Sequence, residues 1–292
     1  MKKLERNKPF PQLYEHIEDW PVYKLSQDRK NFVRELSEFT INRLHKTLSK
    51  VKLYDTIALT SYMERVRLKE ERWKVDPPNE ASFWSKIRKK LNTNAEKETE
   101  FSQTQLDEML SQIVKRYANE IVGTFNKKTF QFARRFLTFF FNRLLNTAAG
   151  RNLGRIFGST HQIQERIQVY GNVNNIRNLF DKGTVVVVPT HFSNLDSILV
   201  GYAMDTVMGL PSFSYGAGLN LYNNGIPAFF MNRLGAYRVD RRKKNPIYLE
   251  TLKGMSNIAI QRGVNSLFFP GGTRSRSGML ETELKKGLLG TV

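Results

Sequence analysis

Four consecutive valines stand out in the hydrophobic pattern of the second half of the chain. Val185 to Val188 lie between Gly183 and Pro189, and a short β-branched run bounded in this way predicts a strand that is buried on both faces. Further short apolar runs alternate with segments of helical pattern, and these runs occupy residues 212–217, 236–239 and 266–269. Such an alternation of strands and helices predicts a layered α/β fold.

The first half of the chain has helical periodicity instead. After a proline-punctuated lead-in, apolar side chains recur at helical spacing within 28–73 and again along a stripe that contains Leu106, Leu110, Ile113 and Tyr117. We therefore expect the α/β class overall, with an N-terminal helical region at 1–150 and a layered α/β domain at 151–292. The glycine- and arginine-rich segment 148–158 marks the expected boundary.

Residues 125–145 combine aromatic and cationic side chains. This segment holds seven phenylalanines with five lysines and arginines between them. Most amphipathic helices of globular proteins face a core, so the favoured interpretation is a core helix of the N-terminal bundle with a solvated basic face. An amphipathic helix in a membrane interface is the second interpretation, because cations would meet lipid phosphates there. Stacking on nucleic-acid bases ranks last.

The net charge of +19 narrows the class of partner. A surplus of this size favours polyanionic surroundings such as nucleic acid, anionic lipid or phosphorylated substrates. The sequence contains no cysteine, which excludes disulfides, thiolate metal sites and a cysteine acyl-enzyme, and which suits a reducing compartment. Neither a targeting segment nor an apolar run of membrane-spanning length is evident. Any membrane contact should therefore be peripheral, and we expect it on the cytoplasmic face.

Candidate catalytic residues follow the valine strand directly. His191 comes just after its carboxyl end, which is where open α/β sheets place reacting groups, and Asp196 follows five residues later. A carboxylate on one ring nitrogen of histidine fixes the tautomer and leaves the other nitrogen free to take a proton. The sequence therefore predicts a His191–Asp196 pair that acts as a general base, although such a pair also occurs by chance.

Two later segments place arginines after short strands. The first is GAYRVDR at 235–241, with Arg238 and Arg241, and the second is FFPGGTRSRSG at 268–278. Glycines let backbone N–H groups approach an anion and arginines clamp phosphate oxygens, so both segments predict phosphate binding. The candidate residues in the second segment are Gly272, Thr273, Arg274 and Arg276. We interpret Arg242, Lys243 and Lys244 as a solvated basic run, while Asp240 could pair with a neighbouring arginine.

In these three segments the chain resembles the glycerolipid acyltransferases, which include the glycerol-3-phosphate and lysophosphatidate acyltransferases. THFSNLD at 190–196 is similar to the family's HxxxxD motif, and the two arginine segments are similar to its second and third blocks in order and spacing. The resemblance covers roughly 170–292, and the long connection between the first two blocks favours the glycerol-3-phosphate branch.

The resemblance implies transfer of a fatty acyl group from acyl-CoA or acyl carrier protein to the hydroxyl of glycerol 3-phosphate, in phospholipid biosynthesis. His191 would be the base and Asp196 would orient it. Arg238, Arg241, Arg274 and Arg276 would hold the acceptor phosphate, and Gly272 and Thr273 would supply backbone donors. No bound cofactor and no metal are implied. A lysophosphatidate acceptor is the alternative within the family, and a non-enzymatic protein that binds anionic membranes or nucleic acid is the alternative from another class.

Two departures from the family pattern are visible. The usual glutamate of the third block is Gly271 here, so any acidic role at that position is lost unless Glu281 or Glu283 replaces it. The family's fourth block, a strand that contains Val-Pro, has no counterpart before Val292. We therefore expect a C-terminally truncated chain whose acyltransferase domain, at 151–292, is incomplete.

Overall fold

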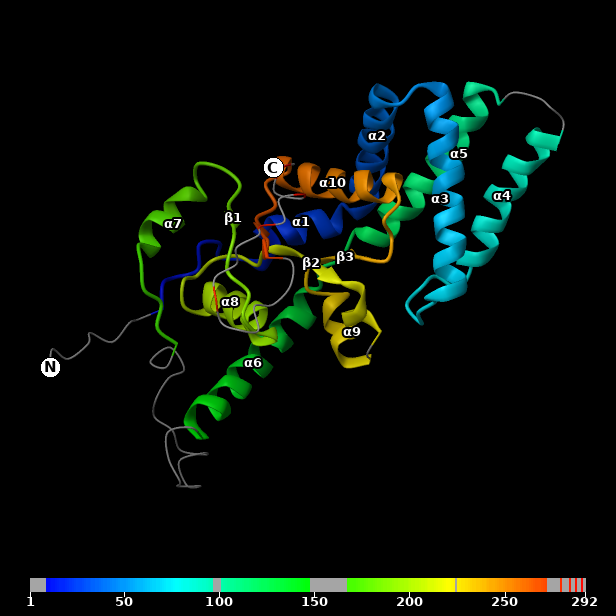
Figure 1. Ribbon diagram of the computed structural model, residues 1–292. Coiled ribbons are helices and arrows are strands. Elements are labelled where there is room, and N and C mark those ends of the chain that lie inside the picture. The colour runs from blue at the N-terminus through cyan, green and yellow to red at the C-terminus, as the bar shows by residue number, and fades with distance from the viewer. Residues whose placement is uncertain are drawn as a thin grey trace, which may run out of the picture.

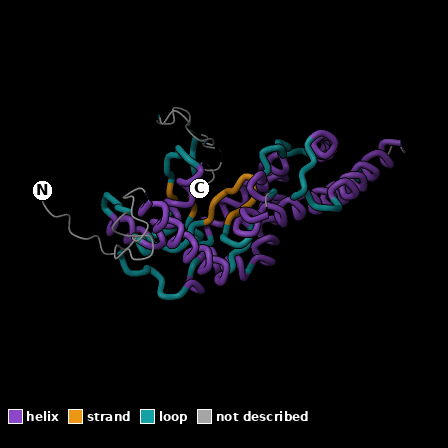
Figure 2. The backbone as a smooth tube through the Cα atoms, turned by 90° about the horizontal axis from the view of Figure 1, so that it is seen from below, coloured by secondary structure: helices purple, strands orange, loops and turns teal. Residues whose placement is uncertain are grey.

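A computed structural model describes residues 9–96, 101–147, 167–223 and 225–271, together with Met279, Leu284, Gly287 and Gly290. Helices predominate among them, and short strands form one parallel sheet that lies between the helices (Figures 1 and 2). The predicted α/β class, with a helical region ahead of the sheet, is confirmed.

The N-terminal region consists of helices joined by short connections. In chain order they are η1 (Ile17–Asp19), α1 (Pro21–Gln27), α2 (Arg29–Thr47), α3 (Lys50–Glu70), α4 (Glu80–Glu96), α5 (Gln103–Ile121) and α6 (Lys127–Thr147). The periodic segment 28–73 divides at Ser49, because the side chain of Ser49 accepts a hydrogen bond from the N–H of Lys52 and so starts α3. Ser102 and Gln105 form a capping box that starts α5 in the same way.

The main core forms where α2, α5 and α10 (Pro246–Gln261) pack together. The stripe predicted on α5 is buried along its whole length, from Leu106 to Tyr117. Ile247 and Ile258 of α10 lie in the same cluster. The helical region and the later part of the chain therefore share one core, which fixes α10 and the loop before it against α3 and α5.

All pairings in the sheet are parallel. The strands are β1 (Val186–Val187), β2 (Ser214–Gly218), β3 (Ala236–Val239) and β4 (Ser266–Leu267), and their spatial order is β1-β4-β2-β3. Val186 lies opposite Ser266, Ser266 opposite Ser214, and Tyr215 opposite Ala236. The connecting helices are α8 (Asn194–Thr206), η4 (Leu219–Tyr222), α9 (Gly225–Met231) and α10, and α7 (Val173–Leu179) precedes β1. Because the strands are parallel, their carboxyl ends lie along the same side of the sheet, which we call the carboxyl edge.

The valine strand is less buried than its composition predicts. Val185 is buried but Val188 is 48% exposed, so the expectation of burial on both faces is wrong. The reason is its place in the sheet: β1 pairs with β4 and lies at one edge of the sheet that the described residues form. Edge strands are less covered than interior ones.

Local residues explain both ends of α10 and the turn before β3. Asn245 caps α10 by accepting from the N–H of Tyr248 at 2.9 Å, with Pro246 at the first helical position, and Gly263 ends the helix with a φ of 76°. Gly235 before β3 has a φ of 82°, and a Cβ there would lie 2.6 Å from Val22 Cγ2. Only glycine fits both the conformation and the space at this position.

The phenylalanine-rich helix α6 packs on α8. Phe141 is buried against Tyr202, with ring centroids 5.1 Å apart, and the hydroxyls of Thr138 and Tyr202 lie 2.8 Å apart. Arg134 donates two hydrogen bonds to the carboxylate of Asp205, at 2.7 and 2.6 Å. These contacts attach α8, the helix that follows His191, to the middle of α6.

The opposite side of α6 is exposed. Four of its phenylalanines, which we call the phenylalanine face, are Phe132, Phe136, Phe139 and Phe140, with 58%, 51%, 60% and 39% of their surface exposed. The favoured interpretation of 125–145 as a bundle core helix is therefore wrong for this side. It holds for the start of the segment, where Phe125 and Phe130 pack around Trp20.

The contact between Arg134 and Asp205 predicts a pH-dependent effect on stability. Burial raises the pKa of Asp205 to about 6 even though Arg134 acts to lower it. A carboxyl with a raised pKa in the folded state stabilises the fold most when it is protonated, so this contribution declines as pH rises from about 4 to about 6. We therefore expect the melting temperature of Asp205→Asn, measured relative to that of the parent chain, to be higher at pH 7.5 than at pH 5. Thermal unfolding of both proteins at the two pH values measures this, and a difference that is independent of pH would contradict it.

Candidate active site

His191 lies on the connection from β1 to α8, and Asp196 lies in the first turn of α8. The Nδ1 atom of His191 is 3.6 Å from Oδ2 of Asp196, and both side chains are partly exposed, at 18% and 25%. This separation places the carboxylate against one ring nitrogen of the imidazole. The pair predicted from the spacing is therefore brought together.

The carboxylate of Asp196 also builds the turn that it belongs to. Its Oδ2 atom accepts hydrogen bonds from the backbone N–H groups of Phe192 and Ser193, both at 2.6 Å, while the Ser193 hydroxyl accepts from Leu195 at 3.0 Å. This capping box starts α8. The fixed turn explains the spacing of five residues, because Asp196 can reach both the imidazole and the amides that precede it.

The strands that lead into the first and third blocks lie side by side. The N–H of Phe268 donates to the carbonyl of Val187 at 2.9 Å, and the ring of Phe269 lies against the imidazole of His191, with centroids 4.4 Å apart. The third block therefore continues from the strand next to His191. Its predicted anion-binding residues, Gly272, Thr273, Arg274 and Arg276, fall outside the described residues, as do Glu281 and Glu283.

The second block lies at the other edge of the sheet. Because β4 and β2 separate β1 from β3, three strand spacings of about 4.8 Å each, roughly 14 Å in all, lie between them. Arg238 donates to the side chain of Asn232 and lies over the ring of Tyr222, with 5.1 Å between the guanidinium carbon and the ring centroid. Arg241 is exposed at the carboxyl end of β3.

Comparison with known proteins identifies the later part of the chain. Residues 166–292 match the family model described as Acyltransferase. The domain at 166–292 is an acyltransferase domain. The match contains all three blocks and confirms the resemblance to the glycerolipid acyltransferases that the blocks indicate.

Three relatives of this chain are named glycerol-3-phosphate acyltransferase. A protein of Pseudomonas paraeruginosa named glycerol-3-phosphate acyltransferase is 30% identical over 169 residues, and proteins with that name from Ectopseudomonas mendocina and Pseudoalteromonas translucida are 27% and 30% identical over 166 and 165 residues. The first match covers 58% of this chain but 18% of the relative. The chain therefore spans less than a fifth of the length of these relatives.

Within the acyltransferase domain, the basic residues after β3 are more buried than predicted. Arg242 and Lys243 are buried, with 6% and 0% of their side chains exposed, whereas Arg241 and Lys244 point to solvent. The interpretation of 242–244 as a solvated run holds for Lys244 alone. Burial is possible because carboxylates from the helical region meet both cations: Arg242 pairs with Asp240 and with Asp76, and Lys243 pairs with Glu120.

Sequence reasoning missed these acidic partners, although a signal for part of them exists. On α3 the buried positions 53, 57 and 60 continue at helical spacing to Glu64 and Arg67, so the apolar stripe runs directly into a charged pair. Charged residues on a buried stripe indicate that a partner of opposite charge lies nearby. The sequence alone could not show which residues pair in this cluster, because partners such as Asp76 and Arg242 are 166 positions apart.

In the parts of the chain that the structure describes, no three His, Asp or Glu side chains are grouped closely enough to hold a metal ion. None of the described helices is both long enough and apolar enough to cross a membrane.

Proposed function

We propose that this chain transfers a fatty acyl group from acyl-CoA or acyl carrier protein to a hydroxyl of glycerol 3-phosphate, with His191 as general base. The observation that carries the proposal is the contact between His191 and Asp196 at the carboxyl edge of a parallel sheet, within an acyltransferase domain. The printed names of the relatives support glycerol 3-phosphate as acceptor. The reaction belongs to phospholipid biosynthesis and needs no bound cofactor.

The proposed acceptor of the hydroxyl proton is the Nε2 atom of His191. Asp196 lies against Nδ1 and favours the tautomer in which that atom carries the hydrogen, so Nε2 is the basic atom. Asp196 keeps this orientation because two backbone amides hold its carboxylate. When the imidazole becomes positively charged, the same carboxylate stabilises it.

The proposed reaction has two steps and no covalent enzyme intermediate. Nε2 of His191 takes the hydroxyl proton while the hydroxyl oxygen attacks the thioester carbonyl carbon, and a tetrahedral oxyanion forms. The carbon–sulfur bond then breaks, the carbonyl is restored as an ester, and the imidazolium returns its proton to the leaving thiolate. Backbone N–H groups of Gly272 and Thr273 are proposed donors to the oxyanion or to phosphate.

Arginines remain the proposed ligands of the acceptor phosphate. Arg274 and Arg276 continue from the strand next to His191, and Arg241 is exposed at the same carboxyl edge as the base. Arg238 donates to Asn232 and lies over the ring of Tyr222, so it would have to leave these contacts to bind phosphate. Guanidinium groups bind phosphate oxygens in pairs, which suits a phosphomonoester.

An assay with parallel acceptors tests the proposal. The purified chain is supplied with acyl-CoA or acyl carrier protein thioester and with glycerol 3-phosphate, dihydroxyacetone phosphate or lysophosphatidate. We expect the fastest turnover with glycerol 3-phosphate. Turnover with lysophosphatidate alone would show that lysophosphatidate is the acceptor. No turnover with any acceptor would favour the non-enzymatic alternative.

The anionic surface of a membrane is a second proposed partner, and a peripheral position on the cytoplasmic face is the proposed location. Its support is the phenylalanine face of α6, which is flanked on the same side by the exposed cations Lys128, Arg135 and Arg143. The helix α9 adds Ile226 and Phe229, which are 77% and 46% exposed, and Phe132 stacks on Phe230. Exposed aromatics beside cations are typical of helices that lie in a lipid interface.

Substitution of the phenylalanine face checks this partner. We expect Phe136→Ser with Phe139→Ser to weaken binding to vesicles that contain anionic lipid by at least about tenfold, because each buried aromatic contributes on the order of 1.5–3 kcal/mol. Binding of the parent chain should fall with added salt. The matched control is Leu59→Ser with Tyr62→Ser, which removes two exposed apolar side chains from α3. Equal binding to neutral and anionic vesicles, unchanged by salt, would contradict an anionic partner.

Nucleic acid stays the least favoured partner. The cations of α6 lie beside phenylalanines that form one continuous exposed side, whereas base stacking needs a groove that follows a phosphate backbone. A non-enzymatic role in binding anionic membranes would account for this surface but not for the His191–Asp196 contact.

A further inference from the structure

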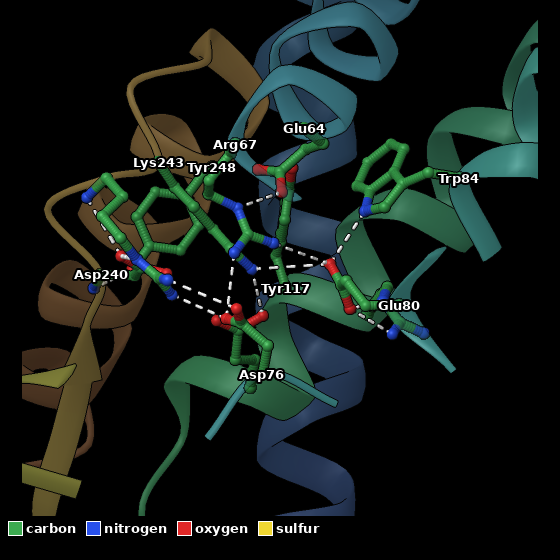
Figure 3. A network of polar contacts seen from close by, with 12 residues as sticks. Glu64, Arg67, Asp76, Glu80, Trp84, Tyr117, Asp240, Lys243 and Tyr248 are labelled. Atoms are coloured by element: carbon green, nitrogen blue, oxygen red, sulfur yellow. Dashed lines mark hydrogen bonds and ion pairs between the residues drawn. The ribbon is translucent and has the colours of Figure 1, made fainter. Parts of the chain in front are cut away.

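A buried cluster of charged residues joins the helical region to the loop after β3 (Figure 3). Its acidic members are Glu64, Asp76, Glu80, Glu120 and Asp240, and its basic members are Arg67, Arg116, Arg242 and Lys243. All but Arg116 have less than a tenth of their side chain exposed. The members come from α3, α4, α5, the connection between α3 and α4, and the loop that leads into α10.

Arg242 is the link between the two parts of the chain. Its guanidinium donates to Oδ1 of Asp76 at 2.6 Å and to the two carboxylate oxygens of Asp240 at 2.9 and 2.7 Å. The same group lies over the indole of Trp73, with 4.0 Å to the ring centroid. Burial opposes ionisation of Asp76, but the hydrogen bonds from Arg242 and from the Trp73 backbone and the charge of Arg67 hold its pKa below the ordinary value.

The backbone on both sides of Arg241 is fixed by these contacts. Oδ1 of Asp240 accepts from the N–H of Arg242 at 3.0 Å, and the carbonyl of Asp240 accepts from the N–H of Lys243 at 3.1 Å. The N–H of Asp240 donates to the hydroxyl of Tyr248 at 2.7 Å. Asp240, Arg242 and Lys243 therefore face inward, and the turn between them directs Arg241 outward at the carboxyl edge of the sheet.

The energetics of the cluster favour a role in geometry. Taking paired charges out of water costs nearly as much as their attraction returns, so packed apolar residues would stabilise this interface equally well. Hydrogen-bonded charges have strict requirements on distance and direction, and they specify one arrangement of the loop where apolar contacts would permit several.

We propose that the helical region positions the phosphate-binding arginine of the second block, with Asp76 and Arg242 as positioning residues that act through Arg241. The inference rests on the proposed function, because it takes Arg241 as a ligand of the acceptor phosphate. It assigns a purpose to the N-terminal helices: they hold one edge of the acceptor site and contribute no group to the reaction.

Asp76→Asn tests the positioning role, because it keeps the shape of the side chain and removes the charge that Arg242 needs. We expect the Michaelis constant for glycerol 3-phosphate to rise about tenfold, which corresponds to about 1.4 kcal/mol. The Michaelis constant for the acyl donor and the turnover number should stay within about twofold, because the donor does not depend on Arg241. Trp84→Phe is the matched control, since it removes a hydrogen bond to Glu80 in the same cluster without touching the loop.

A double-mutant cycle separates positioning from general loss of structure. If Asp76 acts through Arg241, then Asp76→Asn adds no further loss of glycerol 3-phosphate affinity once Arg241→Ala is present. Additive losses would overturn the proposal. Calorimetric binding of glycerol 3-phosphate gives the same cycle without turnover, so a chain that binds this ligand but transfers no acyl group contradicts the proposed function and still tests the inference. A parent chain that binds no glycerol 3-phosphate overturns it.

Amide hydrogen exchange measures directly how firmly the loop between β3 and α10 is held. The amides of Arg242 and Lys243 should exchange at least about tenfold faster in Asp76→Asn than in the parent chain, while amides in the middle of α5 keep their protection. In Trp84→Phe, the amides of Arg242 and Lys243 and those in the middle of α5 should all exchange as slowly as in the parent chain. Unchanged exchange at 242 and 243 in Asp76→Asn would show that the cluster does not hold the loop and would overturn the proposal.

Discussion

His191→Ala is expected to reduce acyl transfer by about 10²–10⁴-fold, which is the usual contribution of a positioned general base. The hydroxyl of the acceptor is a poor nucleophile until its proton is removed, and the imidazole at the carboxyl end of β1 is the proposed acceptor of that proton. The imidazole is partly exposed, so its removal should leave the fold intact. Turnover numbers and melting temperatures of the two proteins measure the effect.

The helical region supplies a matched control for this substitution. Nε2 of His45 lies 3.3 Å from Oδ1 of Asp107, so the chain holds a second histidine–carboxylate contact on the surface of α2 and α5. His45→Ala removes an imidazole that also lies beside a carboxylate, and it should leave turnover unchanged. Near-normal turnover of a folded His191→Ala protein would remove His191 as the base, and equal losses in both variants would mean that activity merely follows stability.

Substitution of Asp196 is expected to have the next largest effect. Asp196→Asn keeps the shape of the side chain but presents no charge to Nδ1 of His191, so the imidazolium formed during the reaction loses its stabilising partner. We expect a fall in turnover that approaches that of His191→Ala, with little change in melting temperature. Asp196→Ala should cause the same fall and also lower the melting temperature, because the capping box that starts α8 is lost at a cost of about 1 kcal/mol.

The two variants together separate the roles of this carboxylate. Asp107→Asn, which alters the contact with His45, is the control for the change in surface charge. Full activity in Asp196→Asn combined with a reduced melting temperature in Asp196→Ala would mean that Asp196 serves only to cap α8. A loss of activity in both would support its role in orienting His191.

Local patterns in the sequence were sufficient to predict much of the fold. The apolar stripe of α5 depends on neighbours within a few positions, and it is present as predicted. The contact between His191 and Asp196 was predictable for the same reason: a strand, a turn and the first turn of a helix bring the two residues together without help from distant parts of the chain.

Features that depend on distant partners were not predictable. A run of lysine and arginine after β3 looks solvated until Asp76 and Glu120 are placed against it, and both come from the helical region, far away in the chain. The exposure of the phenylalanine face of α6 could not be read from periodicity, because phenylalanines lie on both sides of this helix. α8 covers one side and leaves the other to solvent.

Acyl transfer by the purified chain is the measurement that tests the central claim most directly. An isotopically labelled acyl-CoA, or the same acyl group on acyl carrier protein, is incubated with glycerol 3-phosphate, and mass spectrometry is used to look for labelled acylglycerol phosphate. The account predicts that this product forms with the parent chain and is at least about a hundredfold less abundant with His191→Ala. No labelled product from the folded parent chain with either donor, or equal amounts from both proteins, would contradict it.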